Sequence, residues 1–265
     1  MAKPVLGGKR YSLNYMATYR LTNWDTVKVY TVTSVAPGDY SRTSTGDRFG
    51  GNTELQDTIK TYTITNDKSF KIAIDRGNYE QGMRAKKAGE VMRIEMNEQV
   101  IPMIDKNRLA VAAAGATAVS QAITATNNMY QDLLKANEYL DECKAPLEGR
   151  VIFITPAGYT EVKNAITTIL APDYNDKLVG KGFVGELDGV PVVKVPTSYF
   201  PTGVKAIVLH RDALLGVRQV TETRIITDSE LVSGSVLLGR FIFDSFVLEA
   251  KKLGVASVVS GGSQS

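Results

Sequence analysis

Residues that could carry acid–base, nucleophilic or metal chemistry are few in this chain of 265 residues. It contains one histidine, His210, and one cysteine, Cys143. Histidine is the usual general base near neutral pH and the commonest metal ligand, and structural zinc sites combine several histidine or cysteine ligands. The composition therefore argues against zinc sites, Cys–His dyads and most histidine-based triads. We interpret His210 as a residue at the end of a strand and Cys143 as an ordinary buried thiol near a helix end.

Two carboxylate pairs and one glycine motif are the other candidates for a site. Nothing in the sequence places the Asp141–Glu142 or Asp173/Asp176 pairs across a cleft, as glycoside hydrolysis would require. The Gly180–Gly185 segment has the spacing of a dinucleotide fingerprint, but that motif needs a preceding strand and a helix that opens on it. Here the tight-turn signal Asp188-Gly189 follows instead. We predict no catalytic, cofactor-binding or metal site.

The composition also limits the class of protein. With 31 basic and 28 acidic residues the net charge is +3, and no basic block marks a dedicated nucleic-acid binder. A single cysteine permits no intrachain disulfide and fits a reducing compartment. No apolar run approaches the ~20 residues that span a bilayer, and the N-terminus lacks the apolar core of a signal peptide. We expect a protein that is made and folded in a cytosol.

The longest organised feature is a predicted β-hairpin over residues 26–75. Its first strand is Thr26–Val35, its second runs from Leu55 to Ile74, and turn-forming residues fill the loop Ala36–Asn52. At ~3.3 Å per residue such strands would span roughly 35 to 65 Å. A lone two-stranded ribbon is marginal in water, so we expect the hairpin to lie on another copy of the chain. Its charged tip is predicted to make the contacts between subunits, through Asp39, Arg42, Asp47 and Arg48.

Helical periodicity follows the hairpin. The pattern predicts a helix from about Tyr79 to Leu109, with a kink near Gln99–Ile101 because of Pro102. A second helix is predicted to begin near Asn127 and to end before Pro146.

The C-terminal half has the alternation of strands and helices that is typical of an α/β arrangement. A flexible tail is expected after the last strand. The elements expected before it are, in order, a strand at 150–154, a helix at 156–169, a hairpin at 183–195, a strand at 205–209 and an antiparallel pair at 217–227 and 235–249.

The order of these elements resembles the major capsid proteins of tailed bacteriophages with the HK97-type fold. Leu140–Tyr159 looks like that family's stretch of Leu-Asp, Pro, Gly-Arg, apolar strand, Pro and Tyr. Gly182–Val193 looks like its glycine-rich hairpin ending in Gly-Val-Pro-Val. The resemblance covers roughly residues 26–255.

The resemblance implies an α+β fold with an HK97-like division of the chain. The long hairpin corresponds to the family's E-loop and the long helix to its spine helix. The implied parts are an N-terminal arm at 1–25, the E-loop at 26–75, a spine helix and peripheral domain at 76–142 with strands from about 217–250, an axial domain at 143–216, and a flexible tail at 256–265.

It further implies a structural protein rather than an enzyme: a shell subunit that assembles into pentamers and hexamers of an icosahedral phage head around double-stranded DNA. The expected partners are other copies of the chain, a separate scaffolding protein, a portal, and DNA contacted weakly and without sequence specificity. No cofactor, metal or membrane is expected. The chain is expected to assemble in the cytoplasm of the host bacterium and to become part of the virion. Two alternatives stay open: an encapsulin-like nanocompartment shell, and a monomeric α/β enzyme or ligand-binding module.

Overall fold

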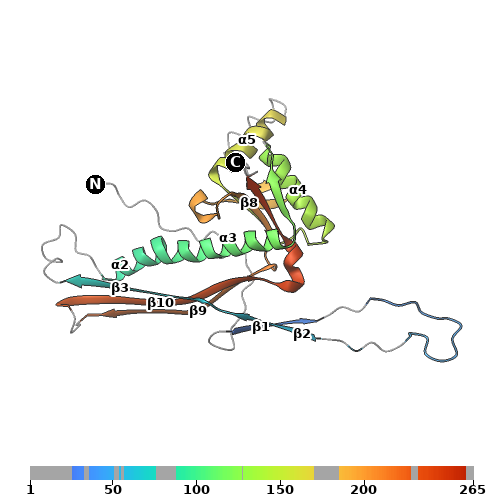
Figure 1. The fold of residues 1–265 in the computed structure, drawn as a ribbon, viewed down its shortest axis with the longest axis horizontal. Coiled ribbons are helices and arrows are strands. Elements are labelled where there is room, and N and C mark those ends of the chain that lie inside the picture. The colour runs from blue at the N-terminus through green and yellow to red at the C-terminus, as the bar shows by residue number, and fades with distance from the viewer. Residues whose placement is uncertain are drawn as a thin grey trace. The chain divides into compact units, whose positions relative to one another are not determined.

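The structure is a computed structural model of the chain, and it describes residues 26–32, 36–50, 54, 57–75, 88–126, 128–169, 185–227 and 232–260. The expected N-terminal arm, the Asp173/Asp176 pair and residues 261–265 of the expected tail lie outside these ranges, as do residues 180–184 of the glycine motif. The chain divides into two compact units (Figure 1), which we describe separately. One is Arg20–Thr65, and the other combines Met1–Tyr19 with Asn66–Ser265.

The smaller unit contains a β-hairpin. Strands β1 (Thr26–Val32) and β2 (Asp57–Thr63) pair antiparallel, from Thr26 opposite Thr63 to Val32 opposite Asp57. Val27 and Val29 are buried while Lys28 between them is exposed, which is the alternation that a two-faced strand requires.

The second strand of this hairpin is shorter than the sequence suggested. Instead of one strand to Ile74, β2 ends at Thr63, and β3 (Asn66–Asp75) pairs antiparallel with β10 (Gly234–Val247) in the larger unit. Seven residues per strand span only about 23 Å at ~3.3 Å each. The physical reason is burial: Phe70, Ile72 and Ile74 alternate along β3 and are half-buried, so this segment gains more from a three-stranded sheet than from a bare ribbon.

The three-stranded sheet has the order β3-β10-β9, with β9 at Leu214–Ile226. The antiparallel pairing of β9 with β10 confirms the predicted C-terminal pair. A long helix lies along one face of the sheet (Figure 1), where Val100 and Ile104 pack against Phe241 and Phe243 of β10. Side chains alternate along a strand, so Leu238 and Arg240 lie on the opposite face, which we call the outer face.

The long helix consists of α2 (Ala88–Glu95), a π-helical turn η1 (Met96–Val100) and α3 (Ile101–Ala118). The π turn ends two residues before Pro102, so the irregularity lies where a kink was predicted. The helix continues nine residues beyond the expected end at Leu109 (118 − 109 = 9), because alanine is the best helix former. Small residues also allow close packing: a Cβ added at Gly115 would lie 2.5 Å from Val247 Cγ2 of β10.

The larger unit contains a second sheet, which is mixed and has six strands. Its order is β4-β11-β8-β5-β7-β6, with β5 parallel to β7, β4 parallel to β11, and the other pairs antiparallel. The strands are β4 (Ala122–Ala125), β5 (Arg150–Ile154), β6 (Glu186–Leu187), β7 (Val190–Lys194), β8 (Val204–His210) and β11 (Val255–Ser260). Two 3-10 turns, η2 (Thr197–Tyr199) and η3 (Glu249–Gly254), connect its elements.

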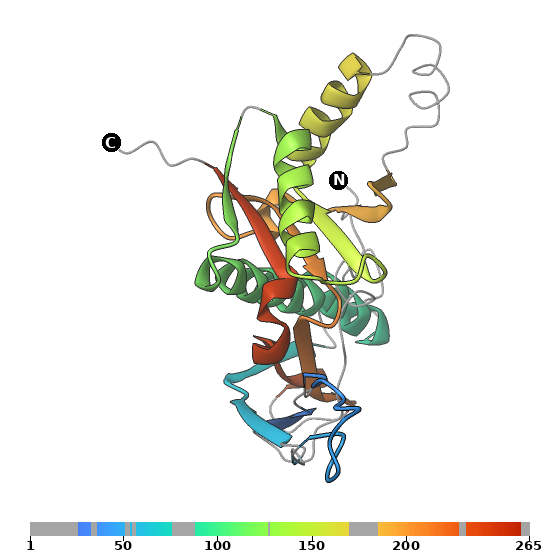
Figure 2. The same cartoon turned by 90° about the vertical axis from the view of Figure 1, so that its right-hand side faces the viewer.

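Helices cover both faces of this sheet. Phe153 of β5 packs in a core with Leu109 and Ala112 of α3. The next residue along, Ile154, packs on the other face, in a core with α4 (Met129–Glu142) and α5 (Pro156–Ile169). These two helices lie side by side in Figure 2. A strand buried on both faces explains why β5 reads as a continuous apolar run.

Two boundaries differ from the expected division. Helix α4 packs on the six-stranded sheet, so the break expected between residues 142 and 143 falls inside one core. The expected tail is also too long, because residues 255–260 form β11, a central strand between β4 and β8. The Gly-Gly-Ser-Gln-Ser ending suggested a tail, but the preceding Val-Ala-Ser-Val-Val is apolar enough to be buried. Among the described helices, none has the length and apolar character needed to cross a membrane.

Candidate assembly interface

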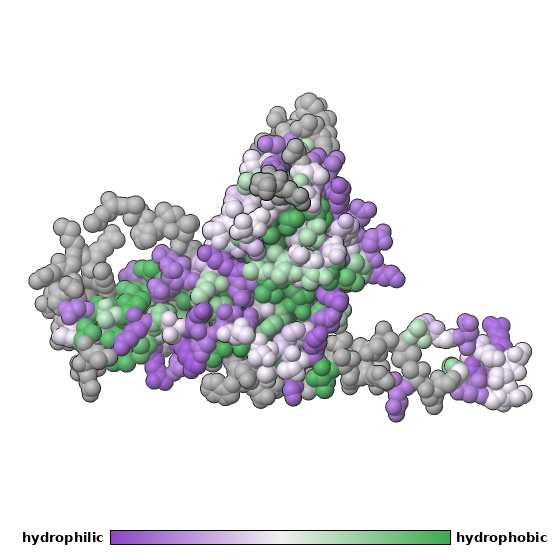
Figure 3. Space-filling model, viewed as in Figure 1, coloured by the Kyte–Doolittle hydropathy of each residue, from purple (hydrophilic) through white to green (hydrophobic). Residues whose placement is uncertain are grey.

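The loop between β1 and β2 closes on itself at its tip. The backbone N–H of Ser41 donates to the carbonyl of Arg48 at 3.0 Å. The Ser44 carbonyl accepts from Arg48 Nε at 3.2 Å, and Asp47 Oδ1 accepts from the backbone N–H of Phe49 at 3.0 Å. These bonds lie within the loop and give its tip a defined shape, and Figure 3 shows hydrophilic residues, in purple, along it.

The four charged residues predicted for intersubunit contacts all lie in this loop and are all exposed. Asp47 and Arg48 hydrogen-bond within the loop. Neither they nor Asp39 and Arg42 form an ion pair with any residue that the structure describes. Their contacts with neighbouring subunits stay a prediction.

An aromatic pair at the tip was not predicted from the sequence. The rings of Tyr40 and Phe49 meet edge to face, with centroids 5.0 Å apart and planes at 71°. Tyr40 is 50% exposed and Phe49 is 84% exposed. We call these two residues the tip pair. The signal was present, because they are the only two aromatic residues in a loop made mostly of Gly, Ser, Thr and charged residues.

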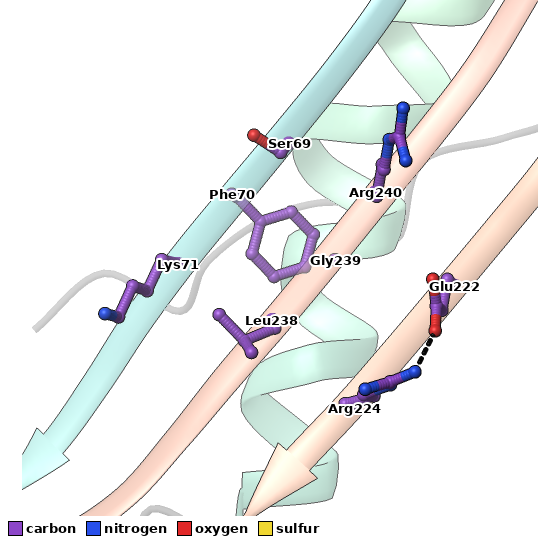
Figure 4. A pocket seen from close by; sticks show the side chains of 8 residues that line it. All are labelled: Ser69, Phe70, Lys71, Glu222, Arg224, Leu238, Gly239 and Arg240. Carbon is purple, nitrogen blue, oxygen red and sulfur yellow. Dashed lines mark hydrogen bonds and ion pairs between the residues drawn. The ribbon is translucent and has the colours of Figure 1, made fainter. Parts of the chain in front are cut away.

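The larger unit has a pit of about 480 Å³ on the three-stranded sheet, shown in Figure 4. Adjacent strands contribute to two neighbouring cross-strand rows on the outer face. One row is Lys71, Leu238 and Arg224, and the next is Ser69, Arg240 and Glu222. Phe70 and Gly239 complete the lining. We call this surface the sheet pit.

Two ion pairs hold the guanidinium groups at the sheet pit. Arg240 donates from Nε to Asp67 Oδ1 at 3.1 Å and from a terminal nitrogen to Asp67 Oδ2 at 2.6 Å. Arg224 donates to Glu222 Oε1 at 2.6 Å (dashed in Figure 4). The hydrogen bonds from Arg240, and secondarily its charge, lower the pKa of Asp67 below its ordinary value, and the carboxylate raises the pKa of Arg240. Lys71 makes no ion pair with another described residue.

His210 and Cys143 lie in a separate pocket of about 330 Å³ where β8 turns toward β9. His210 Nε2 is 3.0 Å from the Glu148 carbonyl, and Nδ1 accepts from the backbone N–H of Asp212 at 3.3 Å. The predicted strand-end position of His210 is thus confirmed. Cys143 is half-buried and follows directly after α4. Among the described residues, no group of three His, Cys, Asp or Glu side chains could hold a metal ion.

Asp141, from one of the carboxylate pairs, belongs to a structural network around Arg150. The buried guanidinium donates to Asp141 Oδ1 at 2.6 Å, to Asn137 Oδ1 at 2.5 Å and to the carbonyls of Pro146 and Ala145 at 3.0 and 2.5 Å. Asn137 Nδ2 in turn donates to Asp188 Oδ2 at 2.7 Å. Asp188 and Gly189 have φ of 52° and 74°, as the predicted tight turn requires.

Comparison with known proteins places this geometry in a class. No protein-family model matches the sequence, and no curated protein matches it. Solved structures do match. The chain is similar to one in the capsid structure of the Cyanophage P-SCSP1u, over 99% of this chain and 92% of that one, with 16% identity and a TM-score of 0.75.

Two further phage structures are similar over nearly the whole chain. The Microbacterium phage Oxtober96 structure matches over 98% of this chain and 94% of its own, with 12% identity and a TM-score of 0.73. The capsid of Ralstonia phage GP4 matches over 100% and 94%, with 10% identity and a TM-score of 0.68. The class is therefore that of the phage capsid fold. In particular, the predicted HK97-like α+β fold is confirmed.

Proposed function

We propose that the chain is the major capsid protein of a tailed double-stranded DNA bacteriophage, which assembles into the pentamers and hexamers of an icosahedral head. One observation carries the proposal: the similarity to a phage capsid structure extends over 99% of this chain and 92% of the other. Because the match leaves few residues unaligned in either chain, it includes the hairpin and both sheets and is not limited to a common core motif.

The physical argument is that the hairpin requires a neighbour. A two-stranded ribbon is marginal alone, and its loop presents an exposed aromatic pair. A surface on one copy that fits a different surface on the next makes a heterologous contact, which closes into rings when the rotation allows. Pentamers and hexamers are such rings.

The roles of the candidate chemical groups fit a structural protein. His210 is used in two hydrogen bonds that fix a turn, and Asp141 binds a buried arginine. The proposed partners are other copies of the chain, a scaffolding protein, a portal, and DNA held by weak contacts that do not depend on sequence. Assembly takes place in the cytoplasm of the host bacterium, and the product is the virion head.

Electron microscopy of the assembled product tests this function. The full chain is expressed together with the genes that flank its own, which would supply a scaffolding protein, and the purified particles are imaged by negative stain. We expect closed icosahedral shells in which this chain is the most abundant protein. Only monomers and small oligomers, with the flanking proteins present, would contradict the proposal. Shells that enclose a dedicated protein cargo would favour a nanocompartment instead.

A further inference from the structure

We propose that the tip pair, Tyr40 and Phe49, is an anchor that enters the sheet pit of a second copy of the chain. This inference rests on the proposed function, since it names the surface on which the hairpin of a shell subunit docks. It assigns the contact to two aromatic rings and places the predicted charged residues around them.

The tip pair has the properties of a preformed anchor. Phe49 is 84% exposed in the single subunit. An aromatic side chain that becomes buried in an interface contributes more to binding than most other residues. Hydrogen bonds within the loop, through Ser41, Ser44 and Asp47, already hold its backbone. Docking therefore orders little additional chain, which is the main cost that a flexible loop would incur.

The sheet pit has the chemistry that aromatic rings prefer. Three cationic side chains line it, from Lys71, Arg224 and Arg240, against one carboxylate from Glu222. The faces of aromatic rings are electron-rich and attract such cations, arginine above all. Leu238 supplies an apolar contact, and the volume of about 480 Å³ is within the range of sites that enclose small organic groups.

Both surfaces carry charges of both signs, which can pair across the contact. Arg240 and Arg224 each bind a carboxylate within the same subunit. Lys71 has no carboxylate partner among the described residues. The tip presents two carboxylates close to its rings in sequence, Asp39 beside Tyr40 and Asp47 two residues from Phe49, and they are balanced by Arg42 and Arg48. Lys71 of the second copy is the natural partner for one of them.

Disulfide trapping between two differently tagged chains tests the contact. Both chains carry Cys143→Ser, which removes the natural thiol. One also carries Asp39→Cys, which lies beside Tyr40 and leaves both rings of the tip pair in place, and the other Lys71→Cys in the wall of the pit. The two are co-assembled and mildly oxidised, and a disulfide requires the two Cα atoms to approach within about 7 Å. We expect a disulfide-linked heterodimer in shells and almost none in unassembled protein.

The matched control places the second cysteine at Ile225. This residue is 44% exposed and lies on the same sheet, but alternation puts it on the face opposite to Arg224. We expect at least about tenfold less heterodimer with Ile225→Cys. Shells that form without the Asp39–Lys71 heterodimer, or with equal yields for the control, would overturn the anchor and leave the proposed function intact. Failure of the wild-type chain to form shells would overturn both.

Substitutions at Phe49 test the chemistry of the anchor. Phe49→Ala should raise the protein concentration needed for shell formation by at least about tenfold, as loss of a central aromatic anchor does. Phe49→Tyr should assemble as the wild type does, because it keeps the ring. The thermal midpoint of the unassembled subunit should not change in either variant, since Phe49 is exposed. Normal assembly of Phe49→Ala overturns the anchor, and normal assembly of Phe49→Leu overturns the role of the cations.

Discussion

Arg150 lies buried between the end of α4 and the start of β5, with its guanidinium surrounded by acceptors. Replacement by alanine leaves the buried Asn137 side chain and the carbonyls of Ala145 and Pro146 without their donor. Breaking a buried charged network from one side costs about 3 kcal/mol. We therefore expect Arg150→Ala to lower the free energy of unfolding of the unassembled subunit by about that amount, measured by urea denaturation.

Lys205 provides the matched control for this prediction. Its ammonium is 3.9 Å from Glu161, and both side chains are substantially exposed. Exposed pairs contribute about 0–1 kcal/mol, so Lys205→Ala should change the unfolding free energy little. Equal losses for the two variants would contradict the structural role assigned to Arg150.

Gly239 is a second residue with a packing role that the sequence does not reveal. A Cβ at this position would lie 2.5 Å from Cε1 of Phe70, whose ring stacks on Phe241 at a centroid distance of 5.7 Å. Overpacking of this kind costs about 1–3 kcal/mol, so Gly239→Ala should lower the thermal midpoint of the subunit. Gly89 in α2 has nothing within 4 Å of an added Cβ, and Gly89→Ala should be neutral or stabilising.

The Asp67–Arg240 pair gives a pH dependence with a definite sign. Its hydrogen bonds lower the pKa of Asp67 in the folded state. The folded protein therefore binds the proton less readily than the unfolded chain, and the pair stabilises the fold above the ordinary carboxyl pKa of 3.8. That contribution is lost as the pH falls through the lowered pKa.

We expect thermal midpoints measured from about pH 5 down to pH 2 to decline less steeply in Asp67→Asn than in the wild type. The asparagine variant keeps the shape of the side chain but has no proton to bind in this range. Parallel declines in the two proteins would show that the ion pair contributes nothing to the acid sensitivity.

At the scale of elements, the hairpin and the larger unit have separate tasks. Replacement of residues 36–50 by a short Gly-Ser turn removes the tip pair and all four predicted contact residues. The cores of the larger unit contain none of these residues. We expect the variant to keep the circular dichroism spectrum and the thermal midpoint of the subunit but to form no closed shells by electron microscopy. Normal shells from this variant would contradict the assembly role of the loop.

Most elements could be predicted from local pattern, because their signals lie within a few residues. Pro156 begins α5, Pro102 marks the irregular turn in the long helix, and the Asp188-Gly189 turn joins β6 to β7. The buried face of α4, from Met129 to Leu140, was likewise readable from the helical period.

Pairing between distant segments could not be predicted in the same way. β3 reads as a continuation of the hairpin, and only its partner β10, more than 150 residues away in the sequence, shows that it belongs to another sheet. β11 was obscured by the glycine and serine residues that follow it. The sheet pit draws on three strands and could not be predicted for the same reason. The contact between Tyr40 and Phe49 depends on the path of the loop, which brings together rings nine residues apart in the sequence.

At the scale of the whole molecule, we propose that the hairpin gains its stability from the assembly. In the proposed arrangement each copy donates its tip to the sheet pit of one neighbour, and its own sheet pit receives the tip of another. Such a head-to-tail arrangement can continue around a ring without a new kind of contact. Each contact contributes a modest free energy, and the same contact is repeated by every subunit of the shell.

Cryo-electron microscopy of the assembled shell is the measurement that tests this claim most directly. Density for the loop at residues 36–50 should be continuous and well ordered, and Tyr40 and Phe49 should lie against β3, β9 and β10 of an adjacent subunit. A loop whose density rests on its own subunit, or projects into solvent with both rings uncovered, would contradict the account.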